Sequence, residues 1–326
     1  MQIGVDPRIE LVMTVQAASN WRGMGLFRMS YPYRDAAFAL ANRFADHEAA
    51  RLYRELLPDG FTFDAPVHFA LCHSQPPEFE PLLPYGSDLE ERAGSAARLY
   101  AFAAALRDFY QASGFAAFLE AWRTTHGTFA GQARGAIDDR WDETLAAYAG
   151  RPHPMRICLA PLSRGNYGPV LDYPDGPVRY AVIGGDTRDD PAQPRFADAA
   201  RMEYLVLHEG AHGFVNPAIE TCREQLDRSS ALFDPIADTM RSQAYQGWFV
   251  VVCEHVVRAV VARLSADPEK VLSAEEERGF RYIRAVVAML AEYEENRDTV
   301  PDFWAFAPRI AAGLAWRAQE AGGYRG

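Results

Sequence analysis

The sequence lacks several features that mark common functional classes. Its four cysteines lie far apart in 326 residues and form no Cys-x-x-Cys pair, so we expect buried, reduced thiols rather than disulfides or cysteine metal ligands. No uncharged apolar run reaches the roughly 18 residues that a membrane-spanning helix needs. The chain also has no internal repeat and no low-complexity tract, which excludes a repeat architecture.

The charge balance is acidic, with a net charge of −11 at pH 7 and basic residues that form no run. A protein of this charge is not expected to bind nucleic acid or anionic membranes. Residues 1–6 contain no basic segment and no long apolar stretch follows them, so no signal peptide is expected. We therefore predict a cytoplasmic protein without a membrane span, the alternative being that a leader has been removed.

The overall composition is that of a soluble globular protein, since 49% of the residues are hydrophobic and 24% are charged. A chain of this length can form one large domain or two. We predict a single domain over residues 1–326. Its N-terminal part (1–150) is expected to be helical, and the rest (151–326) to hold a sheet, a central helix and C-terminal helices.

The secondary-structure pattern is mostly helical, with one short region of strands. Asp6 followed by Pro7 predicts a helix that ends near Ala18. Arg8 and Glu10 are expected on its surface, the alternative being that they pair with charges elsewhere in the fold. The other signals are an alanine-rich helical stretch (88–150) and two strand runs (155–162 and 178–183) with turn-forming strings between them (166–169 and 173–176). A break in the motif helix is expected at Asn216, which can cap a new helix that starts at Pro217, and three more helices follow (231–264, 274–294 and 302–321). This order predicts a predominantly helical α+β protein.

The most informative feature is His208-Glu209-Gly210-Ala211-His212, two histidines four residues apart with a glutamate after the first. On a helix, residues four apart share a face, so both imidazoles can reach one metal ion while Glu209 lies beside it. A zinc hydrolase needs imidazole ligands and a carboxylate that accepts a proton from water. Apolar residues before and after the motif predict a helix there. The alternative is an incidental pair of helix histidines.

A hydrolytic zinc site usually has three protein ligands and one open position. The sequence favours Glu254 as the third ligand, because it lies in an apolar helical run (247–261) where an uncompensated carboxylate is costly. His255 is the neighbouring alternative, about 100° further around the helix. Arg258, one turn beyond Glu254, either neutralises that carboxylate, orients it from behind the metal, or anchors an anionic substrate group. The remaining candidates are Glu220, Glu224, Asp234 and Asp238.

The motif and its surroundings resemble known families. A His-Glu-x-x-His helix followed by a distant glutamate on another helix is similar to the gluzincin branch of the zincin metallopeptidases. The chain also resembles a bacterial family described as domain of unknown function 4932, in residues 5–11, 166–169, 208–217 and 254–258. The resemblance implies His208, His212 and Glu254 as metal ligands and Glu209 as catalytic base, but no particular substrate. The order of sheet, motif helix and later helices suits a zincin-like fold.

The residues and the resemblance together predict a zinc-dependent hydrolase. The favoured activity is that of a peptidase, which acts on a peptide or protein substrate. Glu209 is expected to accept a proton from the attacking water and pass it to the leaving nitrogen. The developing oxyanion also needs a donor. The candidates for this role are Tyr245, Tyr167, His255 and Arg258. Of these we take Tyr245 and Arg258 as candidate catalytic residues.

Two other classes of protein remain open. One is a binding or scaffold protein that keeps the metal helix without turnover, and the other is a helical structural protein with an accidental motif. In zincin-like folds a peptide often pairs with an exposed strand beside the metal. Residues 180–183 are the candidate for that edge strand, with an ordinary internal strand as the alternative.

Overall fold

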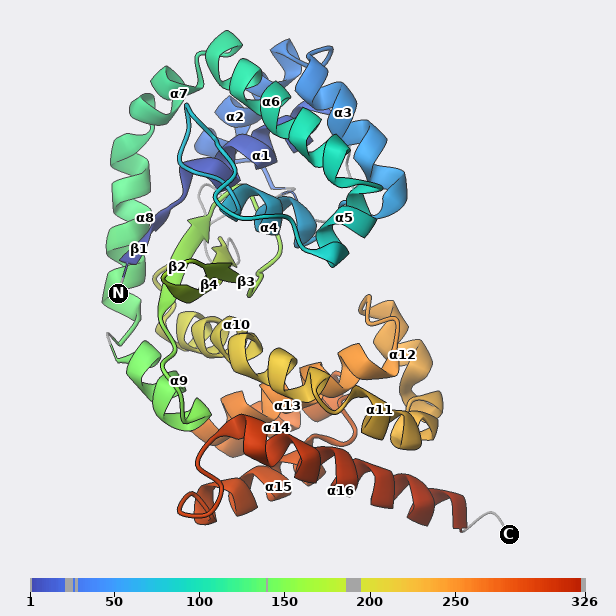
Figure 1. Ribbon diagram of the computed structural model, residues 1–326. Helices are drawn as coiled ribbons and strands as arrows, with labels where there is room; N and C mark the ends of the chain where they lie inside the picture. The colour runs from blue at the N-terminus through green and yellow to red at the C-terminus, as the bar shows by residue number, and fades with distance from the viewer. Residues whose placement is uncertain (1, 21–25, 27–28, 139, 186–194, 324–326) are drawn as a thin grey trace. The chain divides into compact units, whose positions relative to one another are not determined.

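The computed structural model of the chain describes residues 2–20, 26, 29–138, 140–185 and 195–323. The protein is mostly helical, with one small mixed sheet before a helix that carries His208 and His212, and further helices after it (Figure 1). Two compact units divide the chain: unit 1 comprises residues 1–139 and 155–206, and unit 2 comprises residues 140–154 and 207–326. The α+β class is confirmed, whereas the single domain over residues 1–326 stays a prediction.

Unit 1 contains the sheet and the N-terminal helices. Its elements are β1 (Gln2–Val5), α1 (Pro7–Ala18), α2 (Pro32–Arg43), α3 (Glu48–Leu56), the 3-10 helix η1 (Leu57–Asp59), α4 (Ala65–Leu71), α5 (Ser87–Ala93), α6 (Ala96–Ala112), α7 (Phe115–Ala121), α8 (Arg123–Ala136), β2 (Met155–Ala160), β3 (Val170–Tyr173) and β4 (Gly176–Gly184). The helix α10 (Ala199–Glu220) begins in this unit and ends in unit 2.

The sheet has the strand order β1-β2-β4-β3, in which β1, β2 and β4 are parallel and β3 is antiparallel to β4. The two predicted strand runs are confirmed as β2 and β4. The other two strands were not predicted, because β1 has only four residues and contains Gly4, and β3 directly follows a turn-forming string. The second predicted turn closes the β3–β4 hairpin, where Gly176 has a φ of +117° that few other residues adopt.

The interpretation of residues 180–183 as an edge strand is wrong. These residues belong to β4; they pair with β2 on one side, and on the other side Tyr180 and Val182 form backbone hydrogen bonds with Pro169 and Tyr167. Their side chains are completely buried. A strand that is paired on both sides has no free N–H and C=O groups to offer a peptide. The alternative interpretation, an internal strand, is confirmed, and the edges of the sheet are β1 and β3.

Within the described residues, unit 2 is helical. Its elements are α9 (Trp141–Ala149), the second half of α10, α11 (Arg223–Leu226), the 3-10 helices η2 (Asp227–Leu232) and η3 (Asp234–Ile236), α12 (Ala237–Ser242), α13 (Trp248–Leu264), α14 (Pro268–Glu277), α15 (Ile283–Glu295) and α16 (Phe303–Gly323). The apolar helix α13 packs against α14 and α15. No helix among the described residues is long and apolar enough to cross a membrane.

Three helix boundaries differ from the predicted ones. Residues 231–264 do not form one helix but belong to four shorter elements, and the chain leaves the helical conformation at Ala244, between α12 and α13, with a φ of 72°. Gly279, with a φ of 95°, separates α14 from α15 within residues 274–294. The break at Asn216-Pro217 is also wrong, since α10 continues to Glu220 with Pro217 inside it. Pro217 removes one hydrogen bond close to the helix end, and buried neighbours such as Ile219 hold that last turn in the core.

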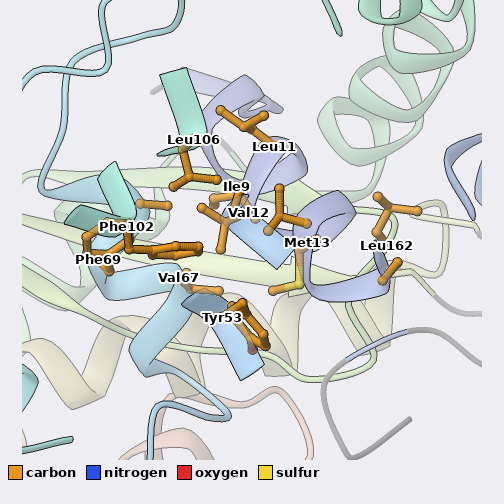
Figure 2. Close-up of a cluster of buried hydrophobic side chains, with 14 of the residues drawn as sticks. Ile9, Leu11, Val12, Met13, Tyr53, Val67, Phe69, Phe102, Leu106 and Leu162 are labelled. Carbon is orange, nitrogen blue, oxygen red and sulfur yellow. The ribbon is translucent and has the colours of Figure 1, made fainter. Parts of the chain in front are cut away.

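The helix α1 lies in the hydrophobic core of unit 1 (Figure 2). Asp6 caps it by accepting a hydrogen bond from the N–H of Arg8 at 2.9 Å, and Pro7 occupies the first helical position. Every residue from Arg8 to Ala18 is buried. The predicted helix is therefore confirmed, but the surface placement of Arg8 and Glu10 is wrong.

Arg8 is tolerated in this core because its three side-chain nitrogen atoms all have acceptors. Nε and Nη2 donate to the Asp6 carboxylate at 3.0 Å and 2.7 Å, and Nη1 donates to the carbonyl oxygen of His73 at 2.8 Å. Buried charges are retained where an opposite charge and hydrogen bonds compensate them. The opening Asp6-Pro7-Arg8 string therefore joins β1, α1 and the end of α4.

Glu10 is completely buried beside Tyr33, whose hydroxyl donates a hydrogen bond to Oε2. Burial raises the pKa of Glu10 to about 8; the Tyr33 hydrogen bond opposes the rise and the charge of Asp6 adds to it. At pH 7 Glu10 is therefore protonated in the folded protein. In the unfolded chain it is ionised, since the ordinary pKa of a glutamate is about 4.3.

We expect Glu10→Gln to remove a pH-dependent loss of stability. Because the pKa is raised on folding, the folded state holds one more proton than the unfolded chain between about pH 5 and about pH 8. Over that range this group lowers the free energy of unfolding by about 1.4 kcal/mol per pH unit as the pH rises. The glutamine keeps the acceptor for Tyr33 but does not titrate, so the variant should show a flatter dependence.

Urea unfolding at several pH values in this range measures the difference. Glu78→Gln, which changes an exposed glutamate of the same unit, is the control and should follow the wild type. Parallel pH dependences for the wild type and Glu10→Gln would contradict the expectation.

Candidate metal centre

The helix α10 presents the motif from its second half, which belongs to unit 2. His208 and Glu209 are buried, with 7% and 6% of their surface exposed, and His212 is half-buried. The two imidazole rings lie one helical turn apart with their centroids 4.9 Å from each other. The predicted helical context of the motif is therefore confirmed.

His153 fastens α10 at the motif. This buried residue precedes β2 and belongs to unit 2. Its Nε2 lies 3.0 Å from the carbonyl oxygen of Gly210, so Nε2 is the nitrogen that carries the proton and donates. Its ring also packs edge-on against Phe214. These contacts hold the segment between the two motif histidines and the turn that follows.

Glu254 reaches the two histidines from α13, in which residues 251–262 are all buried. Its Oε1 lies 3.6 Å from Nε2 of His212, and its Oε2 lies 3.8 Å from Nε2 of His208. The ligand atoms of the three residues are all within 4.8 Å of one another. These separations are longer than hydrogen bonds and close to the spacing of about 3.3 Å between two ligands of one tetrahedral zinc ion. The three side chains form a group that could hold a metal ion.

Asn216 orients His212. Its Oδ1 lies 3.2 Å from Nδ1 of His212, and because an amide oxygen only accepts, Nδ1 carries the proton. The lone pair of Nε2 is then directed to the side where Glu254 lies. Metal-binding histidines commonly have such a partner on the second ring nitrogen. The residue interpreted from the sequence as a helix cap therefore has a different role.

The pKa values favour the protonation states that coordinate a cation. Burial lowers the pKa of His208 well below its ordinary value, and the charges of Arg258 and His212 add to the fall. Burial alone would raise the pKa of Glu254, but Arg258, together with His212 and Tyr245, holds it below the ordinary value. A neutral imidazole and an ionised carboxylate are the forms in which these side chains bind metals.

Glu209 has the opposite shift. Burial raises its pKa to about 8, the negative charge of Glu254 adds to the rise, and the positive charge of Arg258 opposes it. A nearby metal cation would lower this pKa. A carboxylate whose pKa lies closer to neutrality than usual is suited to both accepting and releasing a proton.

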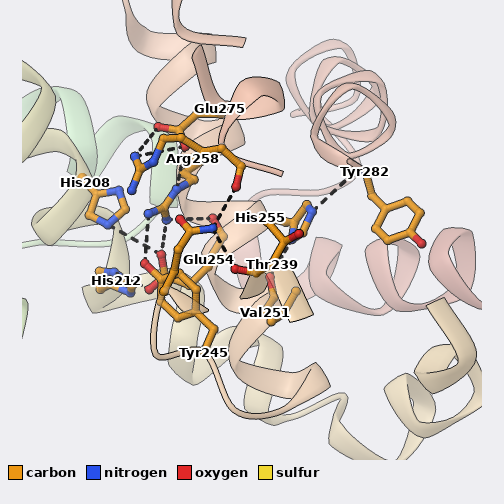
Figure 3. A network of polar contacts seen from close by, with 12 residues as sticks. His208, His212, Thr239, Tyr245, Val251, Glu254, His255, Arg258, Glu275 and Tyr282 are labelled. Carbon is orange, nitrogen blue, oxygen red and sulfur yellow. Dashed lines mark hydrogen bonds and ion pairs between the residues drawn. The ribbon is translucent and has the colours of Figure 1, made fainter. Parts of the chain in front are cut away.

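Arg258 lies behind Glu254 and is almost completely buried (Figure 3). Its Nη1 donates to Oε2 of Glu254, its Nε donates to Glu275 at 2.9 Å, and its Nη2 donates to the hydroxyl of Tyr245 at 3.1 Å. The guanidinium also lies over the ring of Phe280, 4.1 Å from the centroid. Arg258 therefore neutralises Glu254 and orients it, two of the roles that the sequence left open.

His255 points away from the group, as Figure 3 shows. Its Nδ1 donates to the carbonyl oxygen of Val251 at 2.7 Å, and its Nε2 accepts a hydrogen bond of 3.4 Å from the backbone N–H of Tyr282. Both ring nitrogens are thus used within unit 2. The other candidates for a third ligand are all exposed: Glu220, Glu224, Asp234 and Asp238.

The two tyrosine candidates have different positions. Tyr245 is partly buried and contacts Arg258 beside Glu254. Tyr167 belongs to unit 1, where its backbone pairs with Val182 of β4. Of the two, Tyr245 is the one that lies in the same unit as the histidines.

Sequence reasoning missed three neighbours of the site: Glu275, Asn216 and His153. Glu275 is the first of three consecutive glutamates in a polar helix, a pattern typical of a solvated face. His153 lies in a short proline-flanked segment that gives no signal of its contact with α10. Only Asn216 had a usable signal, since it follows His212 by four residues and therefore shares its helix face.

The chain matches a known protein family over most of its length. The family described as domain of unknown function (DUF4932) matches residues 1–312. No curated protein and no solved structure matches the chain. The family match includes β1, the sheet, the motif on α10 and the α13 residues Glu254 and Arg258, so it is not confined to one short motif. The chain belongs to the DUF4932 family.

Proposed function

We propose that this protein is a zinc-dependent hydrolase that cleaves amide bonds in peptides or proteins. The observation that carries the proposal is the convergence of His208, His212 and Glu254 in one buried group, with Glu209 next to His208 on α10. Three protein ligands leave one coordination position open, which is typical of catalytic rather than structural zinc sites. The proposal extends to a zincin-like arrangement, because the ligands come from a motif helix and a second helix as in gluzincins.

The donor set favours zinc over other common cations. Magnesium and calcium prefer sites built only from oxygen atoms, whereas this group offers two imidazole nitrogens and one carboxylate. Zinc imposes no geometric preference of its own and accepts this mixture in tetrahedral sites. Imidazole also binds copper, iron and nickel, so metal analysis has to cover those ions as well.

Glu209 has the role of general base in the proposed reaction. A bound zinc ion would supply Lewis-acid chemistry, polarising the scissile carbonyl group and acidifying water. Glu209 takes the proton from the attacking water and then gives it to the leaving nitrogen. Its raised pKa, which results mainly from burial, supports the second of these steps because it makes the protonated form accessible.

Tyr245 and Arg258 receive different roles. All three guanidinium nitrogens of Arg258 donate to protein acceptors, so we assign it to holding Glu254 rather than to contacting substrate. Tyr245 is only partly buried and is the candidate donor to the developing oxyanion. Burial and the charge of Glu254 raise the pKa of the Tyr245 hydroxyl, and the hydrogen bond from the Arg258 guanidinium opposes that rise.

The alternative is a metal-binding or scaffold protein without turnover. It shares the metal centre and differs in chemistry, so a broad peptide library distinguishes the two. Metal content without hydrolysis of any peptide in the library would favour the scaffold. Metal-free purified protein that takes up no zinc would exclude both.

Purified protein is expected to contain about one equivalent of tightly bound zinc, in line with a three-ligand site. His208→Ala and His212→Ala each remove a ligand and should abolish it. His68→Ala, which changes a half-buried histidine of α4 in unit 1, is the matched control and should retain the metal. Elemental analysis after dialysis measures all four proteins. Unchanged zinc in both motif variants would sink the proposal.

Glu209→Gln should retain zinc but lose hydrolysis by about 10²- to 10⁴-fold, because it removes the proton acceptor and leaves the ligands in place. Glu203→Gln makes the same change earlier on α10 and should keep both metal and activity. Peptide turnover with parallel metal analysis checks the expectation. Loss of metal from Glu209→Gln would show that Glu209 is a ligand, and near-wild-type turnover would remove it from catalysis.

A further inference from the structure

A second carboxylate lies behind the metal centre. Glu275, on α14, is only 2% exposed, whereas the two glutamates that follow it in the sequence are exposed. Its Oε2 accepts from Nε of Arg258 at 2.9 Å, and both of its oxygens accept from Nη1 of Arg278, at 3.1 Å and 3.2 Å. Glu254, Arg258, Glu275 and Arg278 thus form a row of alternating charges that leads away from the two histidines.

The net charge of these four side chains affects how well a metal cation can bind at the two histidines. Glu254 is the ligand with a negative charge, and the Arg258 guanidinium is bound directly to it. The two neutral imidazoles, Glu254 and Arg258 sum to zero, so the negative charge that favours a dication has to come from further groups: Glu209 lies beside His208, and Glu275 lies beside Arg258. Glu275 supplies one further negative charge and offsets Arg258. The positive charge of Arg278 cancels little of the negative charge of Glu275, because the Arg278 side chain is 47% exposed and water screens it.

Glu275 also fixes the geometry of Arg258. The three guanidinium nitrogens donate to three different acceptors. Glu254 lies on α13 like Arg258, and Tyr245 lies just before that helix, whereas Glu275 lies on α14 and so holds the guanidinium from a second helix. With Phe280 beneath its face, the guanidinium plane has one orientation. It engages Oε2 of Glu254, whereas Oε1 lies 3.6 Å from Nε2 of His212.

We propose that Glu275 is a positioning residue of the metal centre. Through Arg258 it fixes the Glu254 carboxylate, and it supplies a negative charge that offsets Arg258 and so favours a dication at the site. This inference rests on the metal-binding part of the proposed function and not on hydrolysis. It also means that α14, which provides no ligand, determines how tightly metal binds.

The test is Glu275→Gln in the full-length protein, which preserves shape and an acceptor oxygen but removes the charge. Its affinity for Zn²⁺, measured by competition with a chromogenic chelator, should fall by about 10- to 100-fold. Glu276→Gln makes the same change at the next residue, which is exposed and pairs with Arg284, and should bind Zn²⁺ like the wild type. Equal affinity of the wild type and Glu275→Gln would overturn the inference.

The double variant Arg258→Gln/Glu275→Gln separates a charge effect from a loss of packing. It removes one charge of each sign, so the net charge around the histidines returns to that of the wild type. If Glu275 acts by offsetting Arg258, the double variant should bind Zn²⁺ more tightly than Glu275→Gln. If Glu275 does not act through its charge, the double variant should bind as weakly or more weakly, because Arg258 no longer holds Glu254; this would overturn the electrostatic part of the inference, and the Co²⁺ spectrum tests the positioning part.

Two further readouts keep the outcomes distinct. The visible spectrum of the Co²⁺-loaded protein should change in Glu275→Gln, because the position of the Glu254 carboxylate changes, and should not change in Glu276→Gln. Should Glu275→Gln not fold, the double variant decides alone: Zn²⁺ affinity within about tenfold of the wild type supports the inference, and any larger loss overturns it. A wild type that binds no Zn²⁺ is a failure of the proposed metal centre instead.

Discussion

An ionised carboxylate inside an apolar helix is the constraint on which unit 2 depends. Removing a carboxylate from water costs several kcal/mol unless an opposite charge and hydrogen bonds compensate it. Glu254 lies in α13 among buried valines, and Arg258, one turn later, provides the compensation. Arg258 is itself buried and forms a second ion pair, with Glu275 on α14. The packing of two helices is therefore tied to the charge balance of the candidate metal centre.

The same compensation keeps the ligand side chains in position independently of a cation. Burial keeps His208 neutral, Asn216 sets the orientation of His212, and Arg258 holds Glu254. Side chains that are already fixed lose little conformational entropy on binding, which favours affinity. The fold is in turn sensitive to substitution at these positions, because removing one partner of a buried ion pair typically destabilises a protein by about 3–5 kcal/mol.

The part of this arrangement that could be predicted from the sequence is the part that depends on local patterns. Two histidines at helical spacing and one carboxylate in an apolar run were sufficient to name the three members of the group. Asn216 was misread because proline after a capping residue usually starts a helix, whereas packing of the last turn keeps α10 continuous. Glu275 had no local signal at all, because its burial depends on where α14 packs. The same holds for β1, which is too short for a pattern and exists through its pairing with a distant strand.

The strand β1 joins the first residues of the chain to its middle. Gln2 pairs with Arg156 and Val5 with Leu159, so this edge of the sheet cannot form until both segments have been synthesised. Contacts between such distant segments form slowly, because the intervening loop has to lose entropy first. Until β1 docks, the edge of the hydrophobic strand β2 is free to pair with another molecule. A chain that loses its first few residues would keep every member of the candidate metal centre and yet be prone to aggregation through β2.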